Sequence, residues 1–434
     1  MNPTVLRERL FDFLKQSPTS FHAVDYLKDL FLKAGFTWLS EKDSWNIKPG
    51  DKVVVTRGDG AIIAFCAGHG DYAGSGIRMI GAHTDSPGLK IKPRPEIRNK
   101  SFVQLGVEVY GGPLLSTWFD RELSVAGRVS FVVEQEGAAP KLTNVLVDFK
   151  DPVAIIPNLA IHLDRDVNNS RTINKQNDLP PLVMLENGGS FQLRDYLADH
   201  VKKMGHPLGD TAFMDYDLFL YDPQAPTVTG MNREFITSGR LDNLVSCYCG
   251  AQALIEEDLS LPALLILNDH EEVGSLSTSG AGGNFLASFL HRLCPDPEQL
   301  ARTAARSFLI SADNAHGIHP GFQDRYEPNH GPVINKGPVI KYNSNQRYAT
   351  DSRSAAVFRF LCSRAKIPFQ EYVVRSDMAC GSTIGPVTAG STGVLTVDAG
   401  IPMFAMHSIR ETAGISDAGH FADLLSVHVK TQML

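Results

Sequence analysis

The sequence predicts an α/β fold into which a second, strand-rich domain is inserted. Two apolar runs, Leu264–Leu267 and Phe308–Ala312, have the length and composition of buried parallel strands, and acidic residues follow each of them. Helical patterns lie around both runs. Between about residues 93 and 233, by contrast, strand patterns dominate, which indicates a separate domain within the first.

Composition places the chain among globular proteins of more than one domain. The chain has 434 residues, of which 43% are hydrophobic and 21% charged, and its net charge is -7. This mild acidity argues against nucleic acid as a partner, because a general binder needs a basic face. Six scattered cysteines without a CxxC pair, no signal-type segment and no apolar run of about 20 residues predict a reduced, cytoplasmic protein that does not enter membranes.

The first third begins the α/β pattern. Two helices are expected over residues 3–34, and three short strands should follow at Lys52–Thr56, Ala61–Cys66 and Ile77–Ala82. The third strand runs into His83-Thr84-Asp85. A histidine at a strand end can bind a metal through one ring nitrogen while a nearby aspartate orients the ring.

The inserted domain should occupy residues 93–233, which leaves residues 1–92 and 234–434 as one discontinuous domain. Lys90–Pro95 is basic and proline-punctuated, so it is expected to be the connector. One helix is predicted over Phe191–Met204, and His162, in an apolar setting, reads as a packing residue. The predicted strands of the insertion are Phe102–Tyr110, Ala126–Val133, Val145–Phe149 and Phe213–Tyr221.

After Ser238 the α/β pattern resumes. Asp242 stands at the first turn of a helix that should reach about Glu257, where its carboxylate suits a helix dipole and can act as a simple cap. The remaining expected elements are a helix opened by Gly280–Gly283, a helix over Pro297–Ser307, a strand over Gly393–Val397 and a final helix over Ser416–Lys430.

Polar residues at the ends of these elements form one set with the chemistry of a metal site. Glu271 and Glu272 adjoin each other after a strand, where two carboxylates repel unless a cation lies between them. Two histidines with several carboxylates suit a pair of divalent cations, zinc first, with manganese or cobalt as alternatives. One carboxylate must then bridge the ions, and a remaining glutamate can act as general base on the attacking water. The set comprises His83, Asp85, Asp242, Glu271, Glu272, Asp313 and His407.

Other catalytic motifs are missing from the sequence. His270-Glu271-Glu272-Val273-Gly274 lacks the second histidine of an HExxH motif, and the chain contains neither a GxSxG elbow nor a phosphate-binding GxxxxGK[ST] loop. These absences weigh against serine hydrolases and nucleotide hydrolases.

Taken together, the motifs resemble those of the aspartyl aminopeptidase family, dinuclear zinc aminopeptidases that form tetrahedral shells. They occur in family order along nearly the whole chain. The main ones are Gly81-Ala82-His83-Thr84-Asp85-Ser86-Pro87, Ser238-Gly239-Arg240-Leu241-Asp242-Asn243, Asn268-Asp269-His270-Glu271-Glu272-Val273-Gly274, Ser311-Ala312-Asp313 and Ala405-Met406-His407-Ser408-Ile409-Arg410-Glu411.

The resemblance implies a role for each member of the set. His83 and Asp313 would hold one metal, and Glu272 and His407 the other. Asp242 would bridge the two ions. Glu271 would be the general base, and Asp85 would orient His83. The fold implied is a mixed sheet flanked by helices, as in zinc peptidases, with the insertion serving as a β-rich dimerisation domain.

Further expectations follow from the resemblance alone. Family members commonly assemble as dodecamers, and many prefer an N-terminal Asp or Glu on the peptide. Lys341 would supply the positive group of such a pocket, and His162 resembles a residue that the insertion contributes to a neighbouring subunit's site.

The leading hypothesis is therefore a metal-dependent aminopeptidase that removes single residues, preferably acidic ones, from peptide N-termini. Two alternatives remain at this point. The same dinuclear site could deacylate small amide metabolites, or the chain could be a non-enzymatic shell protein with a vestigial site.

Overall fold

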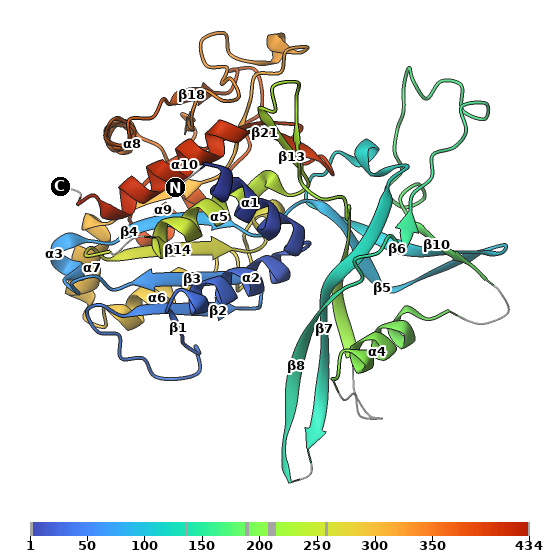
Figure 1. Ribbon diagram of the computed structural model, residues 1–434, viewed down its shortest axis with the longest axis horizontal. Coiled ribbons are helices and arrows are strands. Elements are labelled where there is room, and N and C mark those ends of the chain that lie inside the picture. The colour runs from blue at the N-terminus through green and yellow to red at the C-terminus, as the bar shows by residue number, and fades with distance from the viewer. Residues whose placement is uncertain (1–2, 136, 187–190, 207–213, 257–258, 433–434) are drawn as a thin grey trace. The chain divides into compact units, whose positions relative to one another are not determined.

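The computed structural model describes residues 3–135, 137–186, 191–206, 214–256 and 259–432 (Figure 1). The chain divides into two compact units. The first comprises the described residues of Met1–Ser86, Ala225–Met406 and Arg410–Leu434, and the second comprises those of Pro87–Gln224 together with His407–Ile409. The sequence placed its boundaries at residues 92 and 233.

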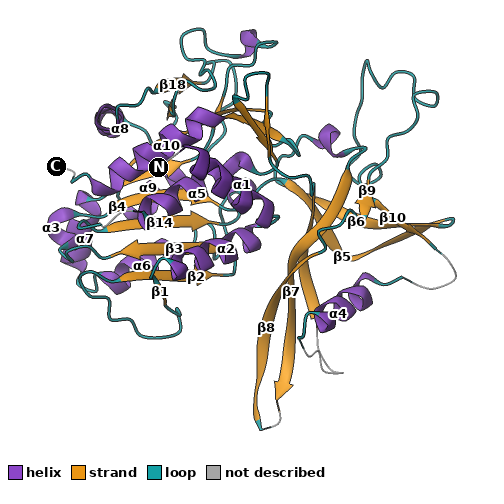
Figure 2. Ribbon diagram, in the orientation of Figure 1, coloured by secondary structure: helices purple, strands orange, loops and turns teal. Residues whose placement is uncertain are grey.

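A nine-stranded mixed sheet forms the centre of the first unit, which confirms the predicted fold class (Figure 2). Four neighbouring strands, β14, β4, β15 and β19, run parallel, so their carboxyl ends meet at one edge of the sheet. The strand order is β1 (Thr37–Trp38), β2 (Lys52–Arg57), β3 (Ala61–Cys66), β14 (Ala263–Asn268), β4 (Arg78–His83), β15 (Phe308–Ala312), β19 (Leu395–Gly400), β17 (Val339–Tyr342) and β18 (Gln370–Val373).

Helices cover both faces of this sheet because its central strands are apolar on both sides. In β14, Leu265 and Leu267 face one core while Leu264 and Ile266 face the other. The first core also contains residues of α1 (Pro3–Gln16), α2 (Ser20–Lys33), α5 (Leu241–Ile255), α8 (Ser352–Ala365) and α10 (Ile415–Lys430). The second contains residues of α3 (Tyr72–Ser75), α6 (Phe285–Leu293) and α7 (Pro297–Arg306).

A smaller five-stranded sheet, which the sequence did not predict, belongs to the same unit. In this sheet Ser238 lies opposite Glu411 in an antiparallel pair. Ser238 shortly precedes Asp242 in the sequence, and Glu411 shortly follows His407. The order is β12 (Thr227–Thr229), β13 (Phe235–Ser238), β21 (Glu411–Gly414), β20 (Pro402–Phe404) and β16 (Ala315–His316).

The second unit is built on a seven-stranded sheet around its own apolar core. Because β11 pairs with both β5 and β7, six of the strands close into a ring, from which β8 continues beside β7. One helix, α4 (Leu193–Lys203), packs on it. The strands are β5 (Gly88–Asn99), β6 (Phe102–Tyr110), β7 (Glu122–Gln135), β8 (Ala138–Asp148), β9 (Ala154–Ile155), β10 (Leu182–Leu185) and β11 (Met214–Tyr221).

Lys90–Pro95, predicted as a connector, lies inside β5 and is a strand. Its prolines fall where the pairing of β5 with β6 shifts register between Ile91 and Glu96, and a residue without an N–H is tolerated at such an irregularity. Phe213 and Glu257, the predicted ends of a strand and a helix, lie outside the described residues.

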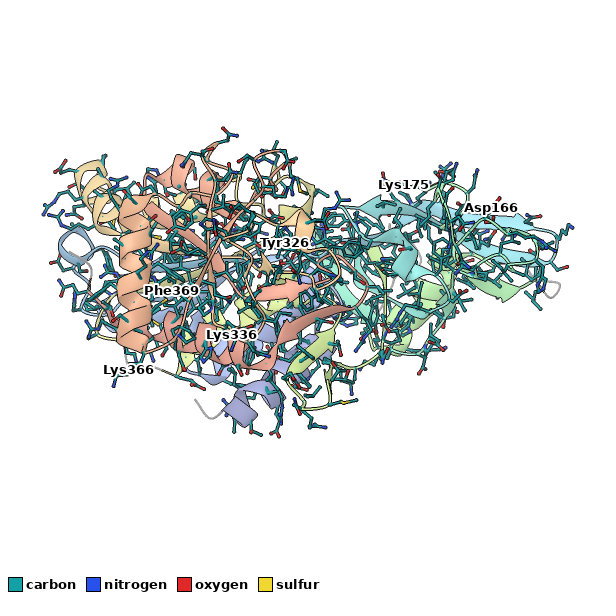
Figure 3. The ribbon with its side chains drawn as sticks, turned by 90° about the horizontal axis from the view of Figure 1, so that it is seen from above. Asp166, Lys175, Tyr326, Lys336, Lys366 and Phe369 are labelled. Carbon is teal, nitrogen blue, oxygen red and sulfur yellow. The ribbon has the colours of Figure 1, made fainter. Side chains whose placement is uncertain are left out.

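Several elements differ from their predicted positions in the first unit. The glycines at 280–283 form a tight turn, and α6 begins only at Phe285; a Cβ on Gly283 would lie 2.5 Å from the Ser277 carbonyl oxygen. The sequence missed α8 and α9 (Ile384–Thr392). Asp351 caps the start of α8, Lys366 follows its end in a left-handed conformation, and Phe369 returns to pack on Phe358 (Figure 3).

Two further properties concern the whole described chain. Its helices include none with both the length and the apolar character needed to cross a membrane. All six cysteines are free thiols, and five of them are buried.

The buried ring of His428 makes the stability of the first unit depend on pH. Its ring is fully buried on α10, with Nε2 3.0 Å from the Met79 carbonyl oxygen, and burial lowers its pKa to about 3. The folded protein therefore binds fewer protons here than the unfolded chain, whose histidine has a pKa near 6.5, so stability falls as pH drops below that value.

We expect His428→Leu to be less stable than wild type at pH 7.5, by about 1 kcal/mol for the lost hydrogen bond. The difference in melting temperature between wild type and His428→Leu should narrow from pH 6.5 to pH 5. Over this range only wild type loses free energy of unfolding through this histidine, at roughly 1.4 kcal/mol per pH unit. Thermal unfolding across that range measures the gap, with His291→Leu, an exposed histidine, as control. A gap independent of pH would contradict a buried neutral ring.

Candidate metal centre

The carboxyl edge of the parallel strands gathers most of the predicted site residues. His83 ends β4, and its backbone stands level with Asn268 at the end of neighbouring β14. Asp313 follows β15, on the other side of β4. Ligands of open α/β sheets bind beyond such strand ends, so this topology creates the site.

His83, Asp242 and Glu272 form the group best placed to hold a metal ion among the described residues. Each offers one ligand atom, and the three atoms lie within 4.8 Å of one another. His83 Nε2 is 3.8 Å from Asp242 Oδ1. Both of these side chains are buried, whereas Glu272 is half-buried.

Asp85 connects the two strand ends through its carboxylate. Its Oδ1 accepts the Glu271 N–H at 3.0 Å, and its Oδ2 accepts the Glu272 N–H at 3.1 Å. The same Oδ1 lies 3.4 Å from His83 Nδ1. The predicted role for Asp85 concerned the histidine ring alone; the structure adds that this buried carboxylate fixes the backbone of both glutamates.

The glutamates lie in a short 3-10 helix, Glu271–Val273, which left-handed residues bound on both sides. His270 has φ 60° and Gly274 has φ 96°. The His270 ring contacts the following loop, where its Nδ1 lies 3.0 Å from Ser277 Oγ. His270 thus makes local contacts, and it is not a member of the group of three candidate ligands found among the described residues.

Asp242 is held by backbone contacts on both sides. Its N–H donates to Glu411 Oε2 at 3.0 Å, and its carbonyl accepts the Ser86 hydroxyl at 2.8 Å. Asn314 Nδ2 lies 3.5 Å from its Oδ1. Glu411 was quoted in the sequence motif but given no role. A glutamate four residues after the candidate ligand His407 was the signal available in the sequence.

Asp313 is paired with Lys341 rather than grouped with the three candidate ligands. Lys341 Nζ lies 3.4 Å from Asp313 Oδ1 and donates to the Asn314 carbonyl at 3.1 Å. Both residues are buried, and the ammonium lies 5.1 Å from the centre of the Tyr348 ring. The predicted substrate-binding cation thus has a carboxylate partner already.

Burial and the crowding of carboxylates shift the pKa values of several groups at this site. Burial raises the pKa of Glu271, with further increases from Asp313, Glu272 and Asp85, although His83 opposes them. Burial also raises the pKa of Asp313, against Lys341. For His83, burial alone would lower the pKa, but Asp85, Glu271 and Asp242 raise it well above its ordinary value. A bound cation would offset the repulsion among these carboxylates.

The donors therefore fit zinc, which binds histidine nitrogen and carboxylate oxygen in buried sites. The fit rests on the chemistry of the His83, Asp242 and Glu272 donors and on the excess of buried carboxylates around them.

His407 and His162 belong to the second unit. His407 is half-buried, has φ 68°, and its Nδ1 lies 3.1 Å from the Gly112 carbonyl oxygen. His162 is exposed on a long loop that also carries Asp166 and Lys175 (Figure 3), and it is not the packing residue first expected. Leu159, Ile161 and Leu163, which are close to it in the sequence, are exposed as well.

Comparison with known proteins yields one consistent family. Residues 13–427 match the model of the aminopeptidase I zinc metalloproteases (M18). A probable M18 family aminopeptidase 2 of Pseudomonas savastanoi pv. phaseolicola is 52% identical over 422 residues, which cover 97% of each chain.

Solved structures agree with this match. A chain in the cryo-EM structure of an Ape4 and Nbr1 complex superposes with a TM-score of 0.93 at 38% identity, covering 98% of this chain and 85% of the other. A chain of the S. cerevisiae mApe1 dodecamer superposes with a TM-score of 0.83 at 29% identity, covering 98% of this chain and 96% of the other.

The contact between Glu411 and the Asp242 N–H predicts an effect on zinc binding. Glu411→Ala removes an acceptor behind a candidate ligand, and such losses typically weaken metal binding about 10- to 100-fold. Glu411→Gln keeps an acceptor oxygen and should retain most of the affinity. Zinc transfer to a competing chelator measures both variants, and equal retention by wild type and Glu411→Ala would refute the link.

Proposed function

The chain belongs to the M18 family and is a zinc-dependent aminopeptidase, and we propose that two metal ions and Glu271 carry out its reaction on peptides with an acidic N-terminal residue. The observation that carries this proposal is the group formed by His83, Asp242 and Glu272, with Asp85 behind it. The amide deacylase and the vestigial shell receive no support, because the relatives described above are named as aminopeptidases.

In the proposed arrangement Asp242 would be the ligand shared by two zinc ions. His83 and Asp313 would hold one ion, and Glu272 and His407 would hold the other. The grouping of His83, Asp242 and Glu272 supports this assignment, since it joins the bridge to one ligand from each side. For Asp313 the support is its electrostatic interaction with Asp242, and for His407 it is the sequence motif.

When bound, zinc polarises the scissile carbonyl and makes the attacking water more acidic. Glu271 takes the proton from that water and returns it to the leaving amine. Its N–H bond to Asp85 fixes the start of its side chain, while the Glu272 N–H bond to the same carboxylate directs that neighbour to the metal group. The two glutamates thus divide the tasks of base and ligand.

The preference for Asp or Glu at the peptide N-terminus needs a positive group near the scissile bond. Lys341 was predicted for this role, and it shares its charge with Asp313, which leaves it partly neutralised. His162, exposed among apolar side chains, suits a residue that enters a neighbouring subunit's site.

Self-association is part of the same proposal. The mApe1 relative is a dodecamer, and the second unit of this chain, closed on itself by β11, would serve as the dimerisation domain. A cytoplasmic location remains the expectation from the six free cysteines.

Glu271→Gln and Glu272→Gln form a matched pair that tests the division of tasks. Both changes are isosteric, remove one charge and affect adjacent residues. We expect Glu271→Gln to keep its zinc and lose about 10²- to 10⁴-fold in kcat, the usual contribution of general acid–base catalysis. Glu272→Gln should lose zinc as well as turnover.

Zinc content by elemental analysis and initial rates on an aminoacyl-anilide measure the pair. Near-normal kcat in Glu271→Gln would remove this residue from the role of base. Equal zinc content in the two variants would remove Glu272 from the ligand set.

A panel of Asp, Glu, Leu and Lys anilides, with chelator and with zinc added back, tests the activity itself. We expect hydrolysis that chelator abolishes and zinc restores, with Asp and Glu fastest. A preference for Leu would contradict the acidic specificity and leave the aminopeptidase activity in place.

A further inference from the structure

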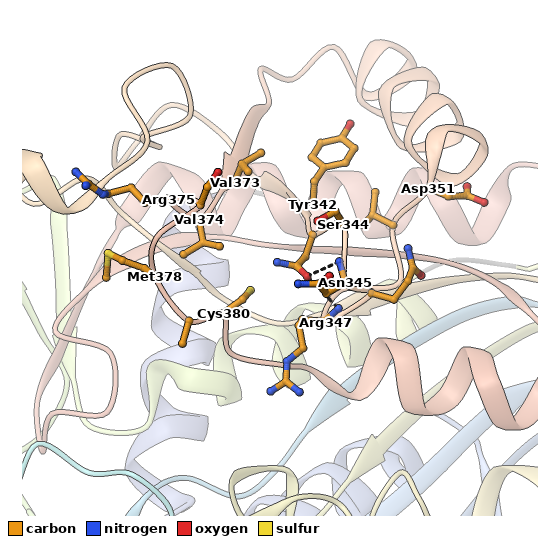
Figure 4. Close-up of a pocket in the computed structure, with 15 residues that line it drawn as sticks. Tyr342, Ser344, Asn345, Arg347, Asp351, Val373, Val374, Arg375, Met378 and Cys380 are labelled. Atoms are coloured by element: carbon orange, nitrogen blue, oxygen red, sulfur yellow. Dashed lines mark hydrogen bonds between the residues drawn. The ribbon is translucent and has the colours of Figure 1, made fainter.

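A cavity of about 790 Å³ lies beyond the end of β17, outside the metal group (Figure 4). Two loops form most of it: residues 342–347, which follow β17, and residues 373–380, which follow β18. Its lining is mainly polar. Amide and hydroxyl side chains come from Asn343, Ser344, Asn345, Gln346, Thr350 and Ser376.

Three charged side chains line this cavity, and two of them are neutralised. Arg375 makes a paired contact with Asp377, with nitrogen–oxygen distances of 2.9 and 2.7 Å. Asp351 pairs with Arg353 at 2.7 Å. The guanidinium of Arg347 makes no ion pair with any residue in the described ranges. The cavity therefore carries one uncompensated positive charge.

The backbone of Arg347 is fixed although its side chain is free. Its N–H donates to Asn343 Oδ1 at 3.4 Å, and its carbonyl accepts the Ser382 hydroxyl at 3.2 Å. Asn343 Oδ1 also accepts the Asn345 N–H at 3.0 Å, so one side chain holds the loop. The guanidinium extends away from this hydrogen-bonded loop (Figure 4). A fixed backbone lowers the entropy lost when such a side chain binds a ligand.

The cavity and the candidate metal centre share a wall. Val374 and Cys380 line the cavity and pack against the small cluster of Ala315, Val339, Tyr348 and Tyr372. The ring of Tyr348 lies under the ammonium of Lys341, which pairs with Asp313. Tyr348 and Lys341 thus connect the lining of the cavity to Asp313 at the candidate metal centre.

We propose that this cavity binds a side-chain carboxylate of the peptide substrate and that Arg347 is the residue that recognises it. The inference rests on the proposed function and names a second determinant of its specificity. A guanidinium matches a carboxylate with two parallel hydrogen bonds, and the surrounding amides can complete the shell. Lys341 is less suited because Asp313 competes for its charge.

Three tripeptide amides test the proposal: Asp-Leu-Leu, Leu-Asp-Leu and Leu-Leu-Leu. Release of the free N-terminal amino acid gives kcat/KM for each. We expect Arg347→Gln to lower the ratio of kcat/KM for an acidic substrate to kcat/KM for the neutral one by roughly 10- to 100-fold. A hydrogen bond to a charged group contributes about this much. A fall for Asp-Leu-Leu assigns the cavity to the first residue, and a fall for Leu-Asp-Leu to the second.

Two variants sharpen the result. Arg347→Lys keeps the charge and should retain part of the ratio, because it loses only the paired geometry. Arg364→Gln removes an exposed charge of α8 outside the cavity and should leave the ratios at wild-type values.

Unchanged ratios in Arg347→Gln would overturn the assignment of the cavity, as would an equal fall for all three substrates. A wild-type protein that releases no N-terminal residue from any of them would instead overturn the proposed function. Zinc content, measured on every variant, separates a local effect on peptide binding from damage to the metal centre.

Discussion

The two hydrogen bonds from the Glu271 and Glu272 amides to the Asp85 carboxylate are the contact on which the candidate site depends. They join the segment after β4 to the segment after β14. A charge-assisted bond between an amide and a buried carboxylate is stronger and better directed than a neutral one. Without it, the short helix of the two glutamates would be bounded only by its left-handed ends, His270 and Gly274.

This contact is available because the sheet is parallel at its centre. The strands β14, β4 and β15 end at one edge, so residues far apart in sequence arrive together with their backbones already ordered. The sheet buries apolar residues on both faces, which leaves its edge as the place where buried carboxylates accumulate. Their mutual repulsion is a cost of folding that a bound cation offsets.

Much of this could be predicted from the sequence, for identifiable reasons. Buried strands such as Phe308–Ala312 are uniform apolar runs, and the acids after them interrupt the pattern visibly. The small sheet that pairs Ser238 with Glu411 was missed because its strands are short and separated by long stretches of chain. Lys341 was read as a free cation, since a sequence does not show which carboxylate a lysine meets. Arg347 gave no signal at all, because an unpaired guanidinium is recognisable only once its surroundings are known.

The pairing of Ser238 with Glu411 also has a consequence for the order in which the protein is made. Asp242 emerges from the ribosome long before Glu411, the residue that accepts its N–H. Asp313, Lys341 and His407 likewise follow Asp242 along the chain. A nascent chain that lacks β21 therefore contains the early strands of the sheet but not Glu411, the residue that holds the backbone of Asp242. The candidate site therefore needs nearly the whole length of the chain before all its members are present.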